Sequence, residues 1–369
     1  EPTLKGNELK YVTECVKSGW ISSSGKFIKK FEDRFSEYCN VKYGISCSSG
    51  TAALHLAVEA MGIGRGDEVI IPTFTMIASC NAVIYAGAKP VLVDSELETW
   101  NINADKIEEK ITKRTKAIMV VHTYGHPVDM DKVKKVADKH NLAIIEDAAE
   151  AHGAEYKGKK AGSLGDIACF SYYANKILTC GEGGMIVTNN EKWAENAGLL
   201  RNHYFGEPRF LHKKIGYNYR MTNIQAAIVL AQLEKIEDYV NARRNNAEAY
   251  NKLLRKTKGI TMPPEAKWAK NVYWMYGILA EKEFGMPMPK LREELLKRGI
   301  DTRSFFIGMH KQPAYSAKDK RFPDTKGGYP ASDYLEKHGL YLPSSSHLAK
   351  NEINKIAGAI KTIKEENGN

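Results

Sequence analysis

The chain has 369 residues, of which 43% are hydrophobic, and carries a formal net charge of +10. This length predicts two domains, or one large domain with an appendage. No apolar run reaches the roughly 20 residues of a transmembrane helix, and the polar N-terminus shows no signal-peptide pattern, so we expect a soluble cytoplasmic protein. The positive charge is scattered over expected helix faces and no basic run is interleaved with aromatic residues, which disfavours nucleic acid as a partner.

The cysteines and histidines show no spacing typical of a metal site. None of the six cysteines forms a CxxC pair, and the ten histidines contain no HExxH pattern. Several cysteines stand in apolar surroundings, so we expect reduced, buried thiols and no structural metal.

The first 60 residues predict two helices, a strand and a third helix. Residues 9–16 and 27–38 have helical spacing, and the Ser/Gly-rich connector between them contains Trp20. Residues 43–47 predict a strand that runs into Ser48-Ser-Gly-Thr51 and then a helix over 52–61. A strand followed by small polar residues and a helix is a favourable anion site, because helix N-terminal amides are unpaired. Ordinary capping by Ser49 or Thr51 explains the same pattern equally well.

Short β-branched runs then alternate with helical stretches, which indicates a mainly parallel sheet covered by helices on both faces. The expected strands after the first are 68–71, 90–94, 117–121, 142–147, 167–171 and 185–188. Such sheets bind ligands beyond the carboxyl ends of their strands. Ser49, Asp147 and Ser171 all follow or end expected strands, so we expect them to lie together.

The pattern changes after residue 200. Residues 193–201 predict a short helix and 203–219 a long loop, and Thr222-Asn-Ile-Gln225 is a capping box. It is expected to open one long helix that continues beyond Arg243 and bridges to a smaller α+β domain, with elements over 272–279, 289–298 and 350–363. We therefore expect a large domain over 1–240 and a small C-terminal domain over 241–369.

Lys176 lies between two expected buried strands and is followed by three glycines in four residues, Gly181 to Gly184. An unpaired lysine is costly to bury, and its amine becomes a nucleophile when water is removed. Our hypothesis is that Lys176 bonds covalently to pyridoxal phosphate. The alternative is a solvated loop lysine beside a flexible turn.

Pyridoxal phosphate needs more than a lysine, and the sequence contains each further part. A carboxylate must keep the pyridine nitrogen protonated, and Asp147 ends a strand where it can do so. A phosphate cradle is expected at Gly50, Thr51 and Ser171. Asp147 taken alone could instead cap the following helix, but its occurrence with the other parts favours the cofactor site.

Several segments together resemble the DegT/DnrJ/EryC1/StrS family of sugar-nucleotide aminotransferases, within the type I fold of aspartate aminotransferase. They span most of the first 225 residues and form a specific combination. The matching segments are Ser48 to His55, Gly66 to Thr75, Glu146 to Gly153, Gly162 to Asp166, Ser171 to Gly184 and Gly216 to Asn223.

This resemblance implies a role for each matching residue of the cofactor site. Lys176 would bond to the cofactor and then move a proton between cofactor and substrate, and Asp147 would pair with the ring nitrogen. Glu150 stands where the family has Gln or Glu near the phenolic oxygen. The phosphate would be held by Gly50, Thr51 and Ser171.

Other residues would face the substrate or a second subunit. Asn218 would reach the phosphate of the neighbouring subunit's cofactor, with Arg220 close to the same shared site. The family commonly stacks an aromatic residue on the cofactor ring, but this chain has Met76 at that position and Phe74 as a neighbour. The candidates for contacts with the sugar nucleotide are Trp20, Arg303 and His310.

The resemblance implies transfer of the amino group of L-glutamate to a nucleotide-linked 4-keto-6-deoxy sugar by a homodimer, which could pair further into a tetramer. A GDP-linked sugar is expected, and a UDP- or dTDP-linked 4-keto or 3-keto sugar is the alternative. A dehydrogenase is disfavoured because no strand–GxGxxG–helix order occurs. A nucleic-acid-binding protein would rest on the charge alone.

Overall fold

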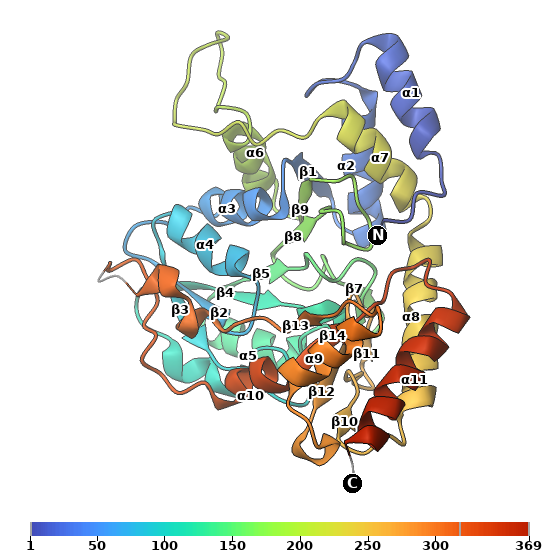
Figure 1. Cartoon of the computed structure of the whole chain (residues 1–369). Helices are drawn as coiled ribbons and strands as arrows, with labels where there is room; N and C mark the ends of the chain where they lie inside the picture. The colour runs from blue at the N-terminus through green and yellow to red at the C-terminus, as the bar shows by residue number, and fades with distance from the viewer. Residues whose placement is uncertain (1, 317–318, 368–369) are drawn as a thin grey trace.

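The computed structural model (Figure 1) describes residues 2–316 and 319–367. Its central element is a seven-stranded sheet with the order β1-β9-β8-β5-β4-β2-β3. Its strands are β1 (Tyr43–Cys47), β2 (Glu68–Pro72), β3 (Lys89–Val93), β4 (Thr115–Val121), β5 (Ala143–Asp147), β8 (Ile167–Ser171) and β9 (Gly184–Thr188). Each strand predicted for this sheet is present. The neighbours from β3 to β8 are parallel, and β9 alone runs antiparallel, to both β8 and β1.

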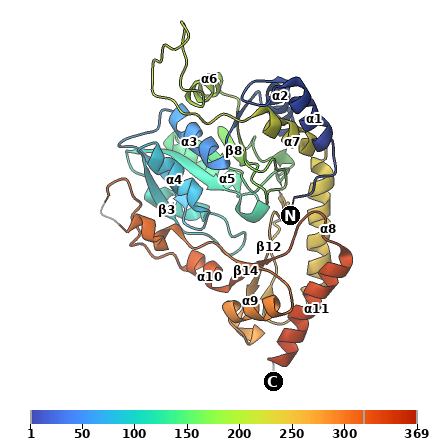
Figure 2. The ribbon, with the colours of Figure 1, turned by 45° about the horizontal axis from the view of Figure 1, so that its top comes forward.

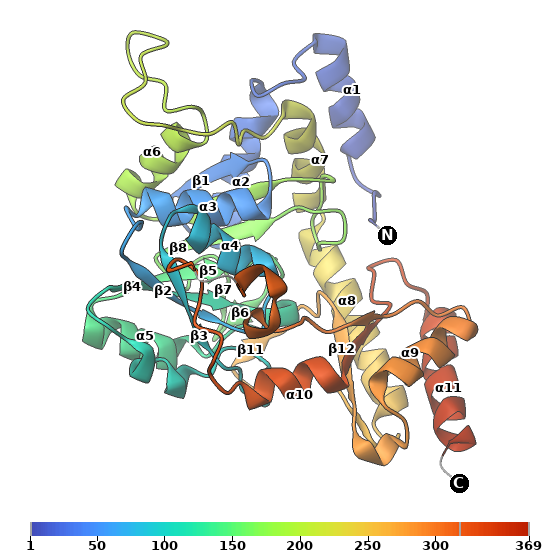
Figure 3. The same cartoon turned by 60° about the vertical axis from the view of Figure 1, so that its left-hand side comes forward.

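Helices cover both faces of the sheet because successive strand residues point to opposite sides. In β4, Ile118 and Val120 face one apolar cluster, whereas Ala117 and Met119 face another. The first cluster contains α2 (Lys26–Cys39), α5 (Met130–His140) and α7 (Asn223–Leu233), and the second contains α3 (Gly50–Ala60), α4 (Ile77–Tyr85) and α6 (Glu191–Leu200). Figure 3 shows α3 and α4 on one side of the sheet and α5 on the other. The predicted fold, a mainly parallel sheet between helices, is confirmed.

The expectation of one long helix from Thr222 past Arg243 was wrong. The capping box is present, with Thr222 accepting from the Gln225 amide, but α7 ends at Leu233 and α8 (Ile236–Leu254) starts anew. Lys235 leaves helical geometry, with φ −117° and ψ 10°. The break lets mainly apolar α7 pack on α1 (Glu8–Ser18) and α2 while amphipathic α8 packs on α11 (Lys350–Glu366).

The C-terminal part forms an α+β unit around an antiparallel sheet with the order β10-β12-β14-β13. Its elements are β10 (Ile260–Thr261), β12 (Tyr276–Ala280), β13 (Arg303–Ser304), β14 (Gly339–Leu342), α9 (Met288–Lys297), α10 (Pro330–His338) and α11. The element expected over 272–279 becomes a strand only at Tyr276, because Tyr273 turns the chain with φ 48°. Residue 240 lies inside α8, so the boundary between the domains 1–240 and 241–369 stays a prediction.

Within residues 2–316 and 319–367, a three-stranded sheet and six short 3-10 helices complete the fold. The strands are β6 (Glu155–Tyr156), β7 (Lys159–Lys160) and β11 (Ala269–Lys270). The 3-10 helices are η1 (Ala104–Lys106), η2 (Glu108–Lys110), η3 (Thr123–Gly125), η4 (Lys282–Phe284), η5 (Met309–Lys311) and η6 (Pro313–Tyr315).

The segment between α6 and α7 stands away from the body of the molecule (Figures 1 and 2). It contains the predicted long loop. None of the helices in the described ranges has the length and apolar character needed to cross a membrane. All six cysteines are buried and unbridged, as predicted.

Candidate active site

Asp147 lies at the carboxyl end of β5, buried, with its carboxylate held in place by the first turn of α4. The Ser79 hydroxyl donates to its Oδ2 at 2.7 Å, and the Ala149 amide donates to Oδ1 at 3.2 Å. Burial raises the pKa of Asp147 above its ordinary value, although these hydrogen bonds oppose the shift. A buried carboxylate fixed in this way can face a protonated ring nitrogen.

Lys176 lies in the connection between β8 and β9, which brings its amine to the same edge of the sheet. Its Nζ is 3.6 Å from the centroid of the Trp274 ring. Burial lowers the pKa of Lys176, whereas the carboxylates of Glu150 and Asp147 pull it upward. An amine with a lowered pKa is a better nucleophile and proton acceptor at neutral pH.

Glu150 is buried near the same amine. The backbone amide of Tyr124 donates to its Oε2 at 2.7 Å, and Tyr124 has φ 54°. Burial raises the pKa of Glu150 to about 7, while Lys176 and the Tyr124 amide oppose the shift. Glu150 therefore titrates near neutral pH and can hold or release a proton there.

The residues expected to form the phosphate cradle lie together where α3 meets the end of β8. Ser49 caps α3 by accepting from the Ala52 amide, so the capping interpretation is confirmed. A Cβ added to Gly50 would lie 2.6 Å from the Ser171 Cβ and 3.0 Å from its Oγ. The absent side chain leaves the first amides of α3 close to the Ser171 hydroxyl, and helix N-terminal amides with a neighbouring hydroxyl suit a phosphate. Thr51 continues the same turn.

The two candidates for covering the cofactor ring have different surroundings. Phe74 is fully buried and packs against Tyr124, Phe305 and Phe306 with centroid distances of 5.9–6.0 Å. Met76 is 48% exposed at the N-cap of α4, the helix that supplies Ser79 to Asp147. Phe74 is therefore a core residue, and Met76 is the one available to a ligand.

The structure places three of the expected substrate residues in different settings. Trp20 is 59% exposed beside a pocket of about 360 Å³, and its carbonyl accepts from Asn223. Arg303 lines a pocket of about 450 Å³ together with Asn175, the neighbour of Lys176. His310 uses both ring nitrogens, with Thr73 at 2.8 Å and Asp333 at 3.0 Å. Its substrate contact stays a prediction, and its visible role is to connect the residue after β2 to α10.

Asn218 and Arg220 lie at the end of the projecting segment, and their contacts in the same chain are with Asn202 and not with Lys176. Asn218 is exposed and pairs with Asn202 in an isolated β-bridge, and the Arg220 guanidinium donates to the Asn202 amide oxygen at 2.8 Å. Their predicted contribution to a neighbouring subunit stays a prediction.

Sequence reasoning missed Ser79, Tyr124 and Trp274, which contact Asp147, Glu150 and Lys176 respectively. It also missed Arg243, which donates to the Trp274 carbonyl. Ser79 had a local signal, since it lies one turn into the helix after the matched segment ending at Thr75. Trp274 is about 100 residues from Lys176 in the chain, so no local pattern connects them. Across residues 2–316 and 319–367, no group of three or more His, Cys, Asp or Glu is placed to hold a metal ion.

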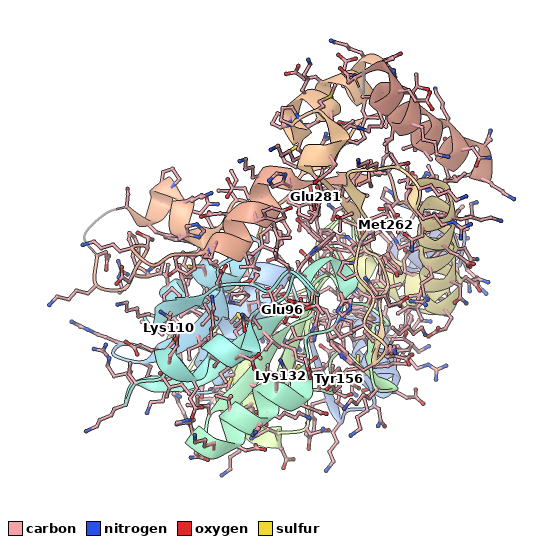
Figure 4. The ribbon with its side chains drawn as sticks, turned by 90° about the horizontal axis from the view of Figure 1, so that it is seen from below. Glu96, Lys110, Lys132, Tyr156, Met262 and Glu281 are labelled. Carbon is pink, nitrogen blue, oxygen red and sulfur yellow. The ribbon has the colours of Figure 1, made fainter. Side chains whose placement is uncertain are left out.

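A further hollow contains none of the predicted site residues. It has a volume of about 730 Å³, and its lining includes five carboxylates, one lysine and Trp268. Glu96 and Lys132 from this hollow are labelled in Figure 4, which views the molecule from below.

The fold and the site define a type I aminotransferase, with Lys176, Asp147 and the first turn of α3 at one end of a mainly parallel sheet. The chain matches the DegT/DnrJ/EryC1/StrS aminotransferase family over residues 2–361, and it belongs to that family. The members of this family use pyridoxal phosphate, and the buried Asp147, the Lys176 amine and the Gly50–Ser171 cradle fit that cofactor.

The relatives with high similarity to this chain include enzymes named for reactions on sugars. The chain is 46% identical to GDP-perosamine synthase from Caulobacter vibrioides over 367 residues, covering 98% of this chain and 96% of that protein. It is 44% identical to GDP-perosamine synthase from Escherichia coli O157:H7 over 361 residues, with 98% and 96% coverage. The PMP form of Spr1654, a putative sugar aminotransferase from Streptococcus pneumoniae, superposes with a TM-score of 0.91 at 27% identity, covering 99% of this chain and 96% of that one.

Proposed function

We propose that this protein is an aminotransferase that moves the amino group of L-glutamate to GDP-4-keto-6-deoxymannose and so produces GDP-perosamine. The observation that carries the chemistry is the Lys176 amine beside buried Asp147 and Glu150 at the strand ends. The similarity to two GDP-perosamine synthases supports the choice of substrate. The product would serve a surface polysaccharide such as the O-antigen of lipopolysaccharide, and the enzyme would act in the cytoplasm.

Each residue has a defined task in this proposal. Pyridoxal phosphate, when bound, supplies an electron sink for the bonds around the transferred nitrogen. Lys176 Nζ would accept a proton from a carbon atom on one side of the transferred nitrogen and return it to the carbon on the other side, a task that a lowered pKa favours. Asp147 would hold a protonated nitrogen, and the first turn of α3 with Ser171 would bind the phosphate.

The proposed assembly is a homodimer in which Asn218 and Arg220 complete the partner's site, with a tetramer as the alternative. Trp20, from the N-terminal part of the chain, and Arg303, from the C-terminal part, would both contact the sugar nucleotide. No nucleic acid or membrane partner is proposed.

The substrate can be tested with purified protein, glutamate and a series of ketosugars linked to GDP, UDP or dTDP. We expect 2-oxoglutarate to form fastest with the GDP-linked 4-keto-6-deoxy sugar. Faster turnover of a UDP- or dTDP-linked sugar would keep the chemistry and overturn the choice of nucleotide.

The role of Lys176 can be tested separately. Lys176→Ala should lose at least about 1,000-fold in kcat, because the variant lacks both the nucleophile and the proton carrier. The exposed Lys192→Ala on α6 is a matched control and should retain full activity. Turnover by Lys176→Ala at the wild-type rate would contradict the mechanism.

A further inference from the structure

Trp274 contacts the Lys176 amine although the two residues come from distant parts of the chain. Lys176 lies after β8 of the large sheet, whereas Trp274 lies just before β12 of the C-terminal unit. The 3.6 Å between Nζ and the ring centroid is well inside the range of a cation–π contact. Trp274 is 5% exposed, so little water competes for the ammonium group at the ring face.

Trp274 is held by its indole and by its backbone. The indole Nε1–H donates to the carbonyl of Asn175 at 2.9 Å, and Asn175 is the residue immediately before Lys176. The backbone carbonyl of Trp274 accepts from the Arg243 guanidinium at 2.7 Å, and that guanidinium also donates to the Ser344 carbonyl at 3.0 Å. These hydrogen bonds fix the ring face relative to the backbone of Lys176. A tryptophan that only packed in the core would not need them.

The Arg243 side chain, which connects these two backbone segments, lies in an unusual environment for a cation. It is buried, its Nε has no hydrogen-bond partner within the described part of the chain, and burial lowers the pKa of its guanidinium to about 10. Burying a cation with two carbonyl partners is costly. In return, Arg243 fixes the backbones of Trp274 and Ser344 to α8.

The Trp274 ring also packs on the segment that controls Glu150. Tyr124 stacks on it with a centroid distance of 6.3 Å and an angle of 29°. A Cβ on Gly125 would lie 3.0 Å from the Trp274 amide nitrogen, so only glycine allows the two backbones to approach this closely. The same turn supplies the Tyr124 amide to Glu150. Trp274 and Glu150 therefore act on one amine from a single packed unit.

We propose that Trp274 is a positioning residue for Lys176: its indole face holds the amine inside the site whenever the amine is not bonded to another group. This proposal rests on the proposed function, since it concerns the interval in which Lys176 must be free to carry a proton. Burial lowers the pKa of Lys176, and the ring face stabilises the charged form, so the ring limits that fall. The C-terminal unit thereby completes the lysine site of the large sheet.

The first test measures the pKa of Lys176 in the full chain prepared without cofactor. Competitive acetylation over a range of pH, followed by mass spectrometry of the peptide containing Lys176, reports the pKa of this one amine. We expect Trp274→Leu to lower it by about 0.5–1 pH unit, and Trp274→Phe to lower it by less, because Phe is a weaker cation–π partner. Trp268→Leu, which removes an indole from the separate acidic hollow, should leave it unchanged.

The second test compares the kinetics of the same variants with pyridoxal phosphate bound. Trp274→Leu should lower kcat about tenfold with little change in KM for the sugar nucleotide, and Trp274→Phe should recover much of the loss. An unchanged Lys176 pKa and kcat in a folded Trp274→Leu protein would overturn the proposal. If that variant does not fold, unchanged values in a folded Trp274→Met protein, which also lacks an aromatic ring face, would overturn it. Wild-type protein that aminates no ketosugar would refute the proposed function, while the acetylation result would still decide the role of Trp274.

Discussion

Glu150 shows how strongly burial can shift the pKa of a carboxyl group. Burial raises its pKa to about 7, although the Tyr124 amide and Lys176 favour the charged form. A carboxyl group with this pKa is partly protonated under physiological conditions. The resemblance places this residue near the phenolic oxygen of the cofactor ring, where a protonated carboxyl group could donate a hydrogen bond.

The raised pKa of Glu150 makes the stability of the cofactor-free protein depend on pH. From about pH 4.5 to 7 the folded protein holds a proton that the unfolded chain has lost, so Glu150 destabilises the fold increasingly as pH rises. Glu150→Gln removes this effect and keeps an oxygen for the Tyr124 amide. We expect the free energy of unfolding of this variant, relative to wild type, to increase from pH 5 to pH 8 in urea titrations.

The exposed Glu365→Gln on α11 is a suitable control for this measurement, and its relative stability should stay constant with pH. A constant difference for Glu150→Gln across the same range would contradict the assignment of a raised pKa to Glu150.

At the scale of elements, the cradle depends on close contact between the start of α3 and the end of β8. Gly50 is buried, and Gly184 of β9 lies equally close, since a Cβ there would be 2.2 Å from the Ser49 carbonyl oxygen. Three elements thus meet without side chains between them. The polar pattern at 48–51 marks this position in the sequence, but the meeting of the elements explains why Gly50 has no side chain.

Gly50→Ala tests this contact directly. Its Cβ would overlap Ser171, and overpacking of this kind costs about 1–3 kcal/mol. We expect the affinity for pyridoxal phosphate, measured by absorbance titration, to fall about tenfold or more, with a loss of stability. Gly198→Ala in α6 is the matched control, because nothing lies within 4 Å of a Cβ there.

The control variant should be stabilised by about 0.5–1 kcal/mol, since alanine loses less backbone entropy than glycine in a helix. Unchanged cofactor affinity in Gly50→Ala would show that the phosphate is bound elsewhere.

For the whole molecule, the projecting segment between α6 and α7 raises the question of a shared site. Asn218 and Arg220 contact Asn202 in their own chain rather than Lys176. Phe210 and Ile215 on the same segment are 71% and 88% exposed. Exposed apolar side chains on a projecting loop are typical of a protein–protein contact, which agrees with the proposed dimer.

A complementation experiment tests the shared site. Lys176→Ala and Asn218→Ala should each be inactive or nearly so alone. If each site takes its lysine from one chain and its asparagine from the other, the mixed dimers contain one intact site. Co-expression of the two variants should then restore about a quarter of the wild-type activity at random pairing.

Separately purified variants that are mixed without subunit exchange provide the control and should stay inactive. Absence of any recovery in verified mixed dimers would indicate that each chain forms its own site.

The sequence by itself determined the elements of the large sheet and the residues at their ends. The signal for a strand is an apolar run of neighbouring residues, so all seven strands, Asp147, Ser171 and the cap at Ser49 could be predicted. The resemblance of the motifs to a known family added the cofactor. The break between α7 and α8 could not be predicted, because each half follows a different packing partner. The tertiary structure alone decided that Trp274 covers Lys176, that Tyr124 serves Glu150 and that His310 joins the residue after β2 to α10. These contacts join residues far apart in the chain, and their energies arise only when separate elements pack together.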